Sequence, residues 1–97
     1  MTDARISTTG AWRQRQGLSV TRVEDDAFIV NPSTDDIFHL NALGRALWSL
    51  LEQPRTLAEL VTALADAFPD IPRAAIIADT EAFIEAITQR GLIEAAN

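Results

Sequence analysis

The sequence contains no cysteine and a single histidine, His39. Zinc sites of the Cys/His type and Cys-His nucleophile pairs therefore lack their residue types, and no disulfide framework is possible. An acid-base pair of His39 with Asp36 or Glu81 is the remaining catalytic hypothesis, but a lone histidine on a strand is typically a packed or solvated side chain. We therefore expect no enzymatic activity, no catalytic residue and no cofactor.

The glycines and the clustered acidic residues offer little to a ligand site. The four glycines are isolated from one another, so no Gly-rich phosphate loop is present. Asp25, Asp26, Asp35 and Asp36 form two acidic pairs, but the spacing of an EF-hand loop, with its glycine and terminal glutamate, is missing. We assign these four residues to turns and predict no metal site.

Lysine is absent, and the eight basic residues are arginines scattered along the chain. Against 14 acidic residues they leave a net charge of -6. Phosphate backbones and anionic membrane surfaces attract basic patches, so neither nucleic acid nor a membrane is an expected partner. No run approaches the roughly 20 apolar residues of a membrane span, and the N-terminus lacks the apolar core of a signal peptide, which predicts a cytoplasmic protein.

The apolar content of 47% in 97 residues fits one folded domain with one modest core. Residues 1–16 are polar and show no sustained period, which predicts a flexible N-terminal arm before a domain spanning residues 17–97. Trp12 is the only aromatic residue of this arm. We expect it to dock on the outside of the domain or to stay mobile, the alternative being that it covers part of a partner groove.

Three short strands are predicted in the first half of the domain. Apolar alternation over residues 18–23 predicts one strand and the run 27–30 a second, with an acidic turn between them that indicates a hairpin. Pro32 lies in a stretch dense in turn formers, after which residues 37–40 predict a third strand. The three strands together favour a small antiparallel meander.

Three helices are predicted in the second half. Asn41 is placed to cap a helix that follows the third strand directly, and Pro54 stops that helix. Thr56 and Glu59 form a capping box that opens a second amphipathic helix. The last helix is predicted from about residue 73 to residue 90, and Gly91 suits the left-handed position after its end.

The third strand is expected at an edge of the sheet. Its residues Phe38 and Leu40 share one face, and Ile37 and His39 share the other. An edge strand presents unpaired backbone N–H and C=O groups, and this one has no lysine or proline to protect it. Such an edge can accept a strand from a bound peptide.

The order and spacing of several motifs over residues 17–94 carry a family resemblance. These motifs are His39-Leu40-Asn41, Gly44, Leu47-Trp48, Thr56-Leu57-Ala58-Glu59-Leu60, Leu64, Phe68, Asp79, Phe83-Ile84, Ile87 and Arg90-Gly91-Leu92-Ile93. In them the chain resembles the PqqD family, which comprises peptide chaperones of pyrroloquinoline quinone biosynthesis and the related recognition domains for ribosomally made, post-translationally modified peptides (RiPPs).

The resemblance implies an α+β, winged-helix-like fold, in which a three-stranded antiparallel β-meander is followed by three α-helices. It also implies a non-catalytic peptide chaperone that binds the leader of a precursor peptide by β-strand addition between the third strand and the third helix. The partner enzyme would be a maturation enzyme such as a radical S-adenosylmethionine protein or a leader peptidase, and a homodimer through the same edge is a further hypothesis. Carried over by position, the peptide-binding residues are Asp36, Ile37, Phe38, His39, Ile76, Ile77, Thr80, Glu81 and Ile84.

The alternative function is that of a winged-helix transcriptional regulator that binds DNA, since three helices with a hairpin can also read a duplex. That function requires a basic recognition helix. The last two predicted helices instead carry Asp66, Asp79, Glu81 and Glu85 against Arg73 and Arg90.

Overall fold

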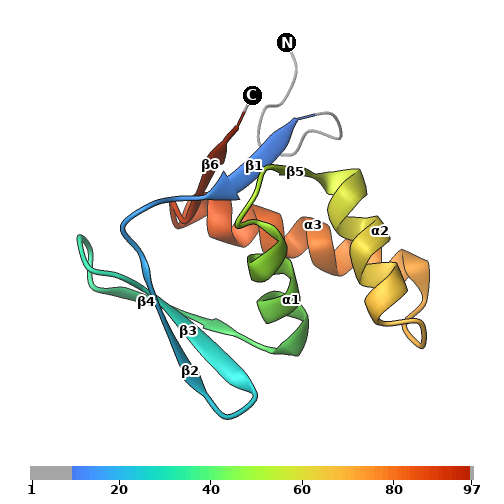
Figure 1. Cartoon of the computed structure of the whole chain (residues 1–97), viewed down its shortest axis with the longest axis horizontal. Helices are drawn as coiled ribbons and strands as arrows, with labels where there is room; N and C mark the ends of the chain where they lie inside the picture. Colours follow the sequence, from blue (N-terminus) through green and yellow to red (C-terminus); the bar gives the residue numbers. More distant parts are fainter. Residues whose placement is uncertain (1–9, 97) are drawn as a thin grey trace.

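The computed structural model describes residues 10–96 and contains a wing sheet of three antiparallel strands (Figure 1). Its strands are β2 (Ser19–Val23), β3 (Asp26–Asn31) and β4 (Asp36–Leu40), in the order β2-β3-β4. A two-residue turn joins β2 to β3, and its first residue, Glu24, has a positive φ of 59°. The predicted meander and the edge position of β4 are both confirmed.

The three predicted helices are present, with the end signals that the sequence contains. In α1 (Ala42–Leu50) the Asn41 side chain accepts a hydrogen bond from the backbone N–H of Gly44 at 2.8 Å. The capping box of Thr56 and Glu59 opens α2 (Leu57–Ala67). The last helix, α3 (Arg73–Gln89), is followed by Gly91 at φ 71°, as the left-handed position requires.

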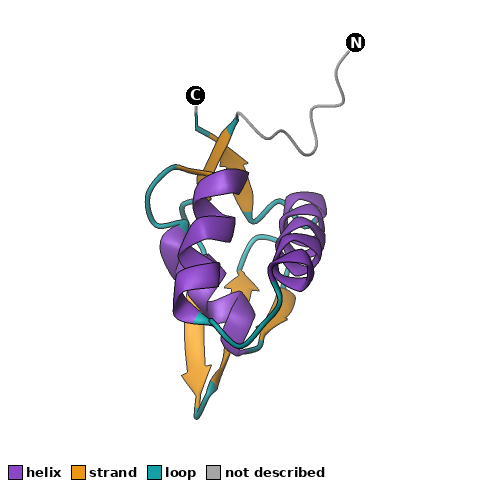
Figure 2. Ribbon diagram, turned by 90° about the vertical axis from the view of Figure 1, so that its right-hand side faces the viewer, coloured by secondary structure: helices purple, strands orange, loops and turns teal. Residues whose placement is uncertain are grey.

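A second sheet, which we call the terminal sheet, was not predicted. It has the order β5-β1-β6 and is built from β1 (Ala11–Gln14), β5 (Arg55–Thr56) and β6 (Ile93–Ala95). Both neighbours pair with β1 in antiparallel fashion. The wing sheet and the terminal sheet lie at different sides of the helices, an arrangement that the perpendicular view also shows (Figure 2).

The expectation of a flexible arm is wrong for residues 10–16, while residues 1–9 lie outside the described part of the chain. Trp12 is 6% exposed and belongs to the main hydrophobic core, so it is neither mobile nor docked on the outside. The strand is held further by Gln14, whose backbone N–H donates to the Leu51 carbonyl at 2.8 Å and whose side chain donates to the Trp48 carbonyl at 2.7 Å. The partners of β1 come from distant parts of the sequence, so no local period marks the strand.

The core lies between the helices and the two sheets. Its fully buried side chains include Ile29 and Leu40 from the wing sheet, Leu47, Leu60 and Leu64 from α1 and α2, and Ile76, Ile84 and Ile87 from α3. At roughly 1.5–3 kcal/mol for each fully buried aliphatic side chain, this cluster is the main source of stability. Within the described residues, none of the helices has the length and apolar character needed to cross a membrane.

Candidate functional site

The backbone polar groups of β4 alternate between β3 and the outside, and the register decides which residues face outward. In a two-residue hairpin the residues that flank the turn, here Val23 and Asp26, form a hydrogen-bonded pair. Such pairs alternate with pairs that are not hydrogen-bonded. Phe28 therefore also bonds to β2, whereas Ala27 and Ile29 direct their backbone groups toward β4.

The same alternation continues into β4. Ala27 pairs with Leu40 and Ile29 with Phe38, so Leu40 and Phe38 use their backbone groups within the sheet. The N–H and C=O groups of Ile37 and His39 consequently point away from β3, toward the free edge. An incoming strand would find its hydrogen-bond partners at these two residues.

The side chains of β4 divide between the two faces as predicted. Leu40 is 1% exposed and Phe38 is half-buried, so both lie on the core side of the wing sheet. Ile37 is 62% exposed, and His39 is also exposed, on the opposite face. The unpaired backbone groups of β4 therefore lie between one face of the sheet that packs on the core and one face that is exposed to solvent.

The His39 side chain contacts residues other than those proposed for a catalytic pair. Its ring lies 5.1 Å from the Phe28 ring, centroid to centroid, and its Nε2 atom lies 3.3 Å from Asp26 Oδ2. Both side chains of the His39–Asp26 pair are 52% exposed. The expected partners Asp36 and Glu81 are not involved, so His39 is an exposed, stacked side chain on the outer face, and only its backbone belongs to the edge.

On α3, one stripe of side chains lies beside β4. The Phe83 ring packs edge-on against the Phe38 ring at a centroid distance of 6.2 Å. The guanidinium carbon of Arg90 lies 5.5 Å from the centroid of the same Phe38 ring. Phe83 and Arg90 are seven residues apart, about two helical turns, and Asp79 precedes Phe83 by one turn on the same stripe. We call Ile37, Phe38, His39, Asp79, Phe83 and Arg90 together the β4–α3 surface.

The residues that the sequence assigned to this site from α3 lie elsewhere on the helix. Ile76, Thr80 and Ile84 are 0% exposed and belong to the core, so they are not available to a bound peptide. At about 100° per residue, their stripe is centred roughly a sixth of a turn from Phe83, and Ile77 and Glu81 lie on its far flank. The sequence did not show which face of α3 lies beside β4, because the apolar positions of α3 are too broadly distributed to indicate its orientation.

An apolar hollow lies at the α1 end of the β4–α3 surface. It has a volume of about 270 Å³ and is lined by Leu43, Gly44, Asp79, Ala82 and Phe83, among others. A Cβ atom on Gly44 would lie 3.3 Å from the Phe83 ring and 3.4 Å from Leu40 Cδ2. The glycine thus permits the close approach of α1 to Phe83.

Across the described part of the chain, no three His, Cys, Asp or Glu side chains gather closely enough to hold a metal ion. The two acidic pairs lie at the hairpin turns: Asp25 in the β2–β3 turn and Asp35, with a φ of 62°, in the β3–β4 turn. What the site offers is therefore a set of backbone hydrogen-bond groups beside aromatic side chains, which suits binding.

The fold and the site define a class: an α+β domain with a three-stranded wing sheet, three helices and an unprotected edge strand beside α3. The model of the family described as coenzyme PQQ synthesis protein D (PqqD) matches residues 26–93, well over half of the chain. The chain belongs to the PqqD family. A search of curated proteins found no significant match.

Two solved structures share the fold. One is TbiB1 in complex with the TbiA(beta) leader peptide, with a TM-score of 0.74 and 24% sequence identity, covering 88% of this chain and 98% of TbiB1. The other is the solution structure of the PqqD truncation of Methylobacterium extorquens PqqCD, described as a functional and stand-alone RiPP recognition element. It has a TM-score of 0.72 and 20% identity, and covers 92% of this chain and 94% of the truncation. The winged, three-helix architecture expected from the sequence is confirmed by these neighbours.

Proposed function

We propose that this chain is a recognition element that binds the leader of a ribosomally made precursor peptide as an added strand on β4. The single observation that carries the proposal is the free edge of β4, with the backbone groups of Ile37 and His39 directed outward beside Phe83 of α3. Membership of the PqqD family and the leader peptide present in the TbiB1 complex support it. The domain would deliver the bound precursor to a modifying enzyme in the cytoplasm and perform no chemistry itself.

The energy of such a complex is within reach of the available contacts. A micromolar complex requires about -8 kcal/mol. Backbone hydrogen bonds to the β4 edge contribute about 1 kcal/mol each, and apolar anchors against Phe38, Phe83 and the hollow at Gly44 contribute roughly 1.5–3 kcal/mol each. Three or four hydrogen bonds and three anchors together contribute roughly 7.5–13 kcal/mol, so only the upper part of this range leaves a surplus to offset part of the ordering cost of the peptide.

Proline substitutions test strand addition directly. His39→Pro removes an outward N–H and places a ring where the added strand would lie, so we expect a folded protein whose peptide affinity falls by at least tenfold. Phe38→Pro removes a hydrogen bond to β3 and should damage the fold itself. The probe is a fluorescein-labelled peptide selected from a random 15-residue display library on the wild-type chain, measured by fluorescence anisotropy, with circular dichroism to report the fold.

Val20→Pro is the matched control, because the β2 register directs the Val20 N–H outward at the opposite edge of the same sheet. This variant should fold and bind the probe as the wild type does. Equal loss of affinity in Val20→Pro and His39→Pro, with both folded, would show that the β4 edge has no special role.

A further inference from the structure

Arg90 occupies the end of the β4–α3 surface opposite the hollow at Gly44. Its guanidinium lies over the Phe38 ring at 5.5 Å, a distance at which a cation is attracted by the face of an aromatic ring. Its side chain is exposed, and it forms no ion pair with any residue that the structure describes. This cation–π contact does not use the guanidinium N–H groups as hydrogen-bond donors, so they are available to a ligand.

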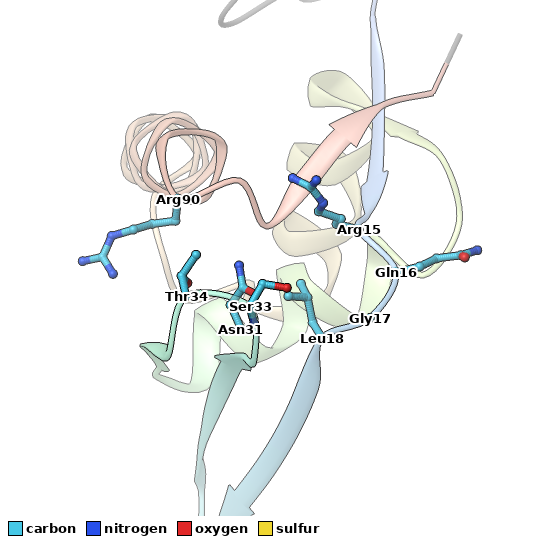
Figure 3. Close-up of a pocket in the computed structure, with 8 residues that line it drawn as sticks. All are labelled: Arg15, Gln16, Gly17, Leu18, Asn31, Ser33, Thr34 and Arg90. Carbon is cyan, nitrogen blue, oxygen red and sulfur yellow. Dashed lines mark hydrogen bonds between the residues drawn. The ribbon is translucent and has the colours of Figure 1, made fainter.

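A polar cavity of about 270 Å³ adjoins Arg90 (Figure 3). It lies between the C-terminal end of α3, the β1–β2 connection and the β3–β4 turn, and it is lined by Arg15, Asn31, Ser33 and Thr34 together with Arg90. No carboxylate side chain is among its lining residues. Figure 3 shows the polar side chains of the turn rising toward Arg15, while the Arg90 side chain extends away from them.

Both arginines line this cavity on a chain whose net charge is -6, but the Arg90 side chain extends away from Arg15 (Figure 3). Asp35 lies in the β3–β4 turn and Asp36 begins β4, but neither lies within ion-pair distance of either guanidinium. Arg15 donates one hydrogen bond, at 3.3 Å, to the carbonyl of Gly91, just beyond the end of α3. A purely structural role, in which the arginines compensate the negative end of the helix dipole, is the competing explanation.

We propose that Arg90 binds a carboxylate side chain of the leader strand on β4, and so makes an acidic residue part of the recognised motif. The inference rests on the proposed function and specifies its ligand. Guanidinium–carboxylate hydrogen bonds are charge-assisted and directional, so they select an acidic side chain over a neutral one of the same shape.

The two ends of the β4–α3 surface also set a spacing. The part of α3 that lines the hollow at Gly44 is centred about nine residues before Arg90. This separation is roughly 13 Å along the helix at 1.5 Å per residue. A strand advances about 3.3 Å per residue, so this distance corresponds to roughly four residues. Four is an even number, which keeps both side chains on the same face of the added strand. The recognised motif is therefore an apolar anchor and an acidic residue about four positions apart.

The experiment compares peptides selected from the random 15-residue display library on the wild-type chain, on Arg90→Gln and on the Arg15→Gln/Arg90→Gln double variant. We expect acidic residues enriched about four positions from an apolar residue on the wild type, and no such enrichment on the two variants. Arg22→Gln, which removes an exposed arginine from β2, is the matched control and should select the same motif as the wild type.

A double-mutant cycle on one selected peptide measures the contact itself. Changing its acidic residue to the amide should weaken binding about tenfold on the wild type and much less on Arg90→Gln. Equal losses on both proteins, or an acidic preference that survives in Arg90→Gln, would overturn the inference. The inference would also be overturned if the arginine variants lowered the melting temperature and left the selected motif unchanged, because that result is expected when the arginines only compensate the helix dipole. If the inference fails while His39→Pro still abolishes binding, strand addition stands and only the carboxylate site falls.

Discussion

At the scale of single residues, recognition depends on which side chains of α3 lie beside β4. Phe38 connects the two elements, with Phe83 packed against one side of its ring and Arg90 over the ring. The sequence predicted which side chains of β4 share a face, because alternation in a strand has a period of two and leaves little choice of face. It did not predict which face of α3 lies beside β4, because the isoleucines of α3 fall on more than one stripe.

Thr80 distinguishes the two faces of α3 in a single substitution. Its side chain is 0% exposed, and among the described residues its Oγ1 atom has no hydrogen-bond partner. Thr80→Val replaces this hydroxyl with a methyl group of similar size, so we expect the free energy of unfolding to rise by about 1 kcal/mol or more. Urea denaturation measures this change.

The same variant should bind the selected peptide with unchanged affinity, because Thr80 lies in the core. Phe83→Ala, one turn further along the helix and on the neighbouring stripe, should weaken binding at least tenfold. Weakened binding by Thr80→Val, with unchanged binding by Phe83→Ala, would instead place the peptide on the face of α3 that contains Thr80.

At the scale of elements, β1 shows how a segment without a visible pattern becomes structural. It pairs with β5 on one side and β6 on the other, and the ion pair of Arg13 with Glu94, at 2.9 Å, adds a contact to β6. These partners are separated from β1 by about forty and eighty residues of chain. Local sequence therefore does not reveal the strand, and only the assembled helices bring its partners into place.

Trp12→Ala measures what β1 contributes. Truncation of a buried tryptophan typically costs 3–5 kcal/mol, so we expect a loss of about this size in urea denaturation. Arg13→Ala, the neighbouring residue in β1, removes an ion pair whose side chains are 51% and 41% exposed, and a surface pair contributes about 1 kcal/mol or less. Similar losses in the two variants would contradict the assignment of Trp12 to the core.

At the scale of the whole molecule, the described residues share one hydrophobic core. Trp12 of β1 and Trp48 of α1 are both 6% exposed and belong to the same cluster of buried residues, together with side chains from the wing sheet. The wing sheet and the terminal sheet are therefore coupled through a common interior, although they lie at different sides of the helices.

This shared core predicts a single unfolding transition. Fluorescence of Trp12 alone, in a Trp48→Phe variant, and of Trp48 alone, in a Trp12→Phe variant, should each change at the same urea concentration as the circular dichroism of that variant. A Trp12 signal that changes well before the loss of helix would instead describe a segment that detaches independently of the domain.

The sequence by itself determined the elements whose signals are local: the β2–β3 hairpin and β4, the Asn41 and Thr56 caps, and the Gly91 helix end. It also determined the edge position of β4, since consecutive antiparallel strands form a meander whose last strand has one free side. Only the tertiary structure decided the terminal sheet around Trp12 and the face of α3 that meets β4, because both depend on contacts between segments far apart in the chain. The local period shows on which face of an element the apolar side chains lie. The packing of the helices determines which other element that face contacts.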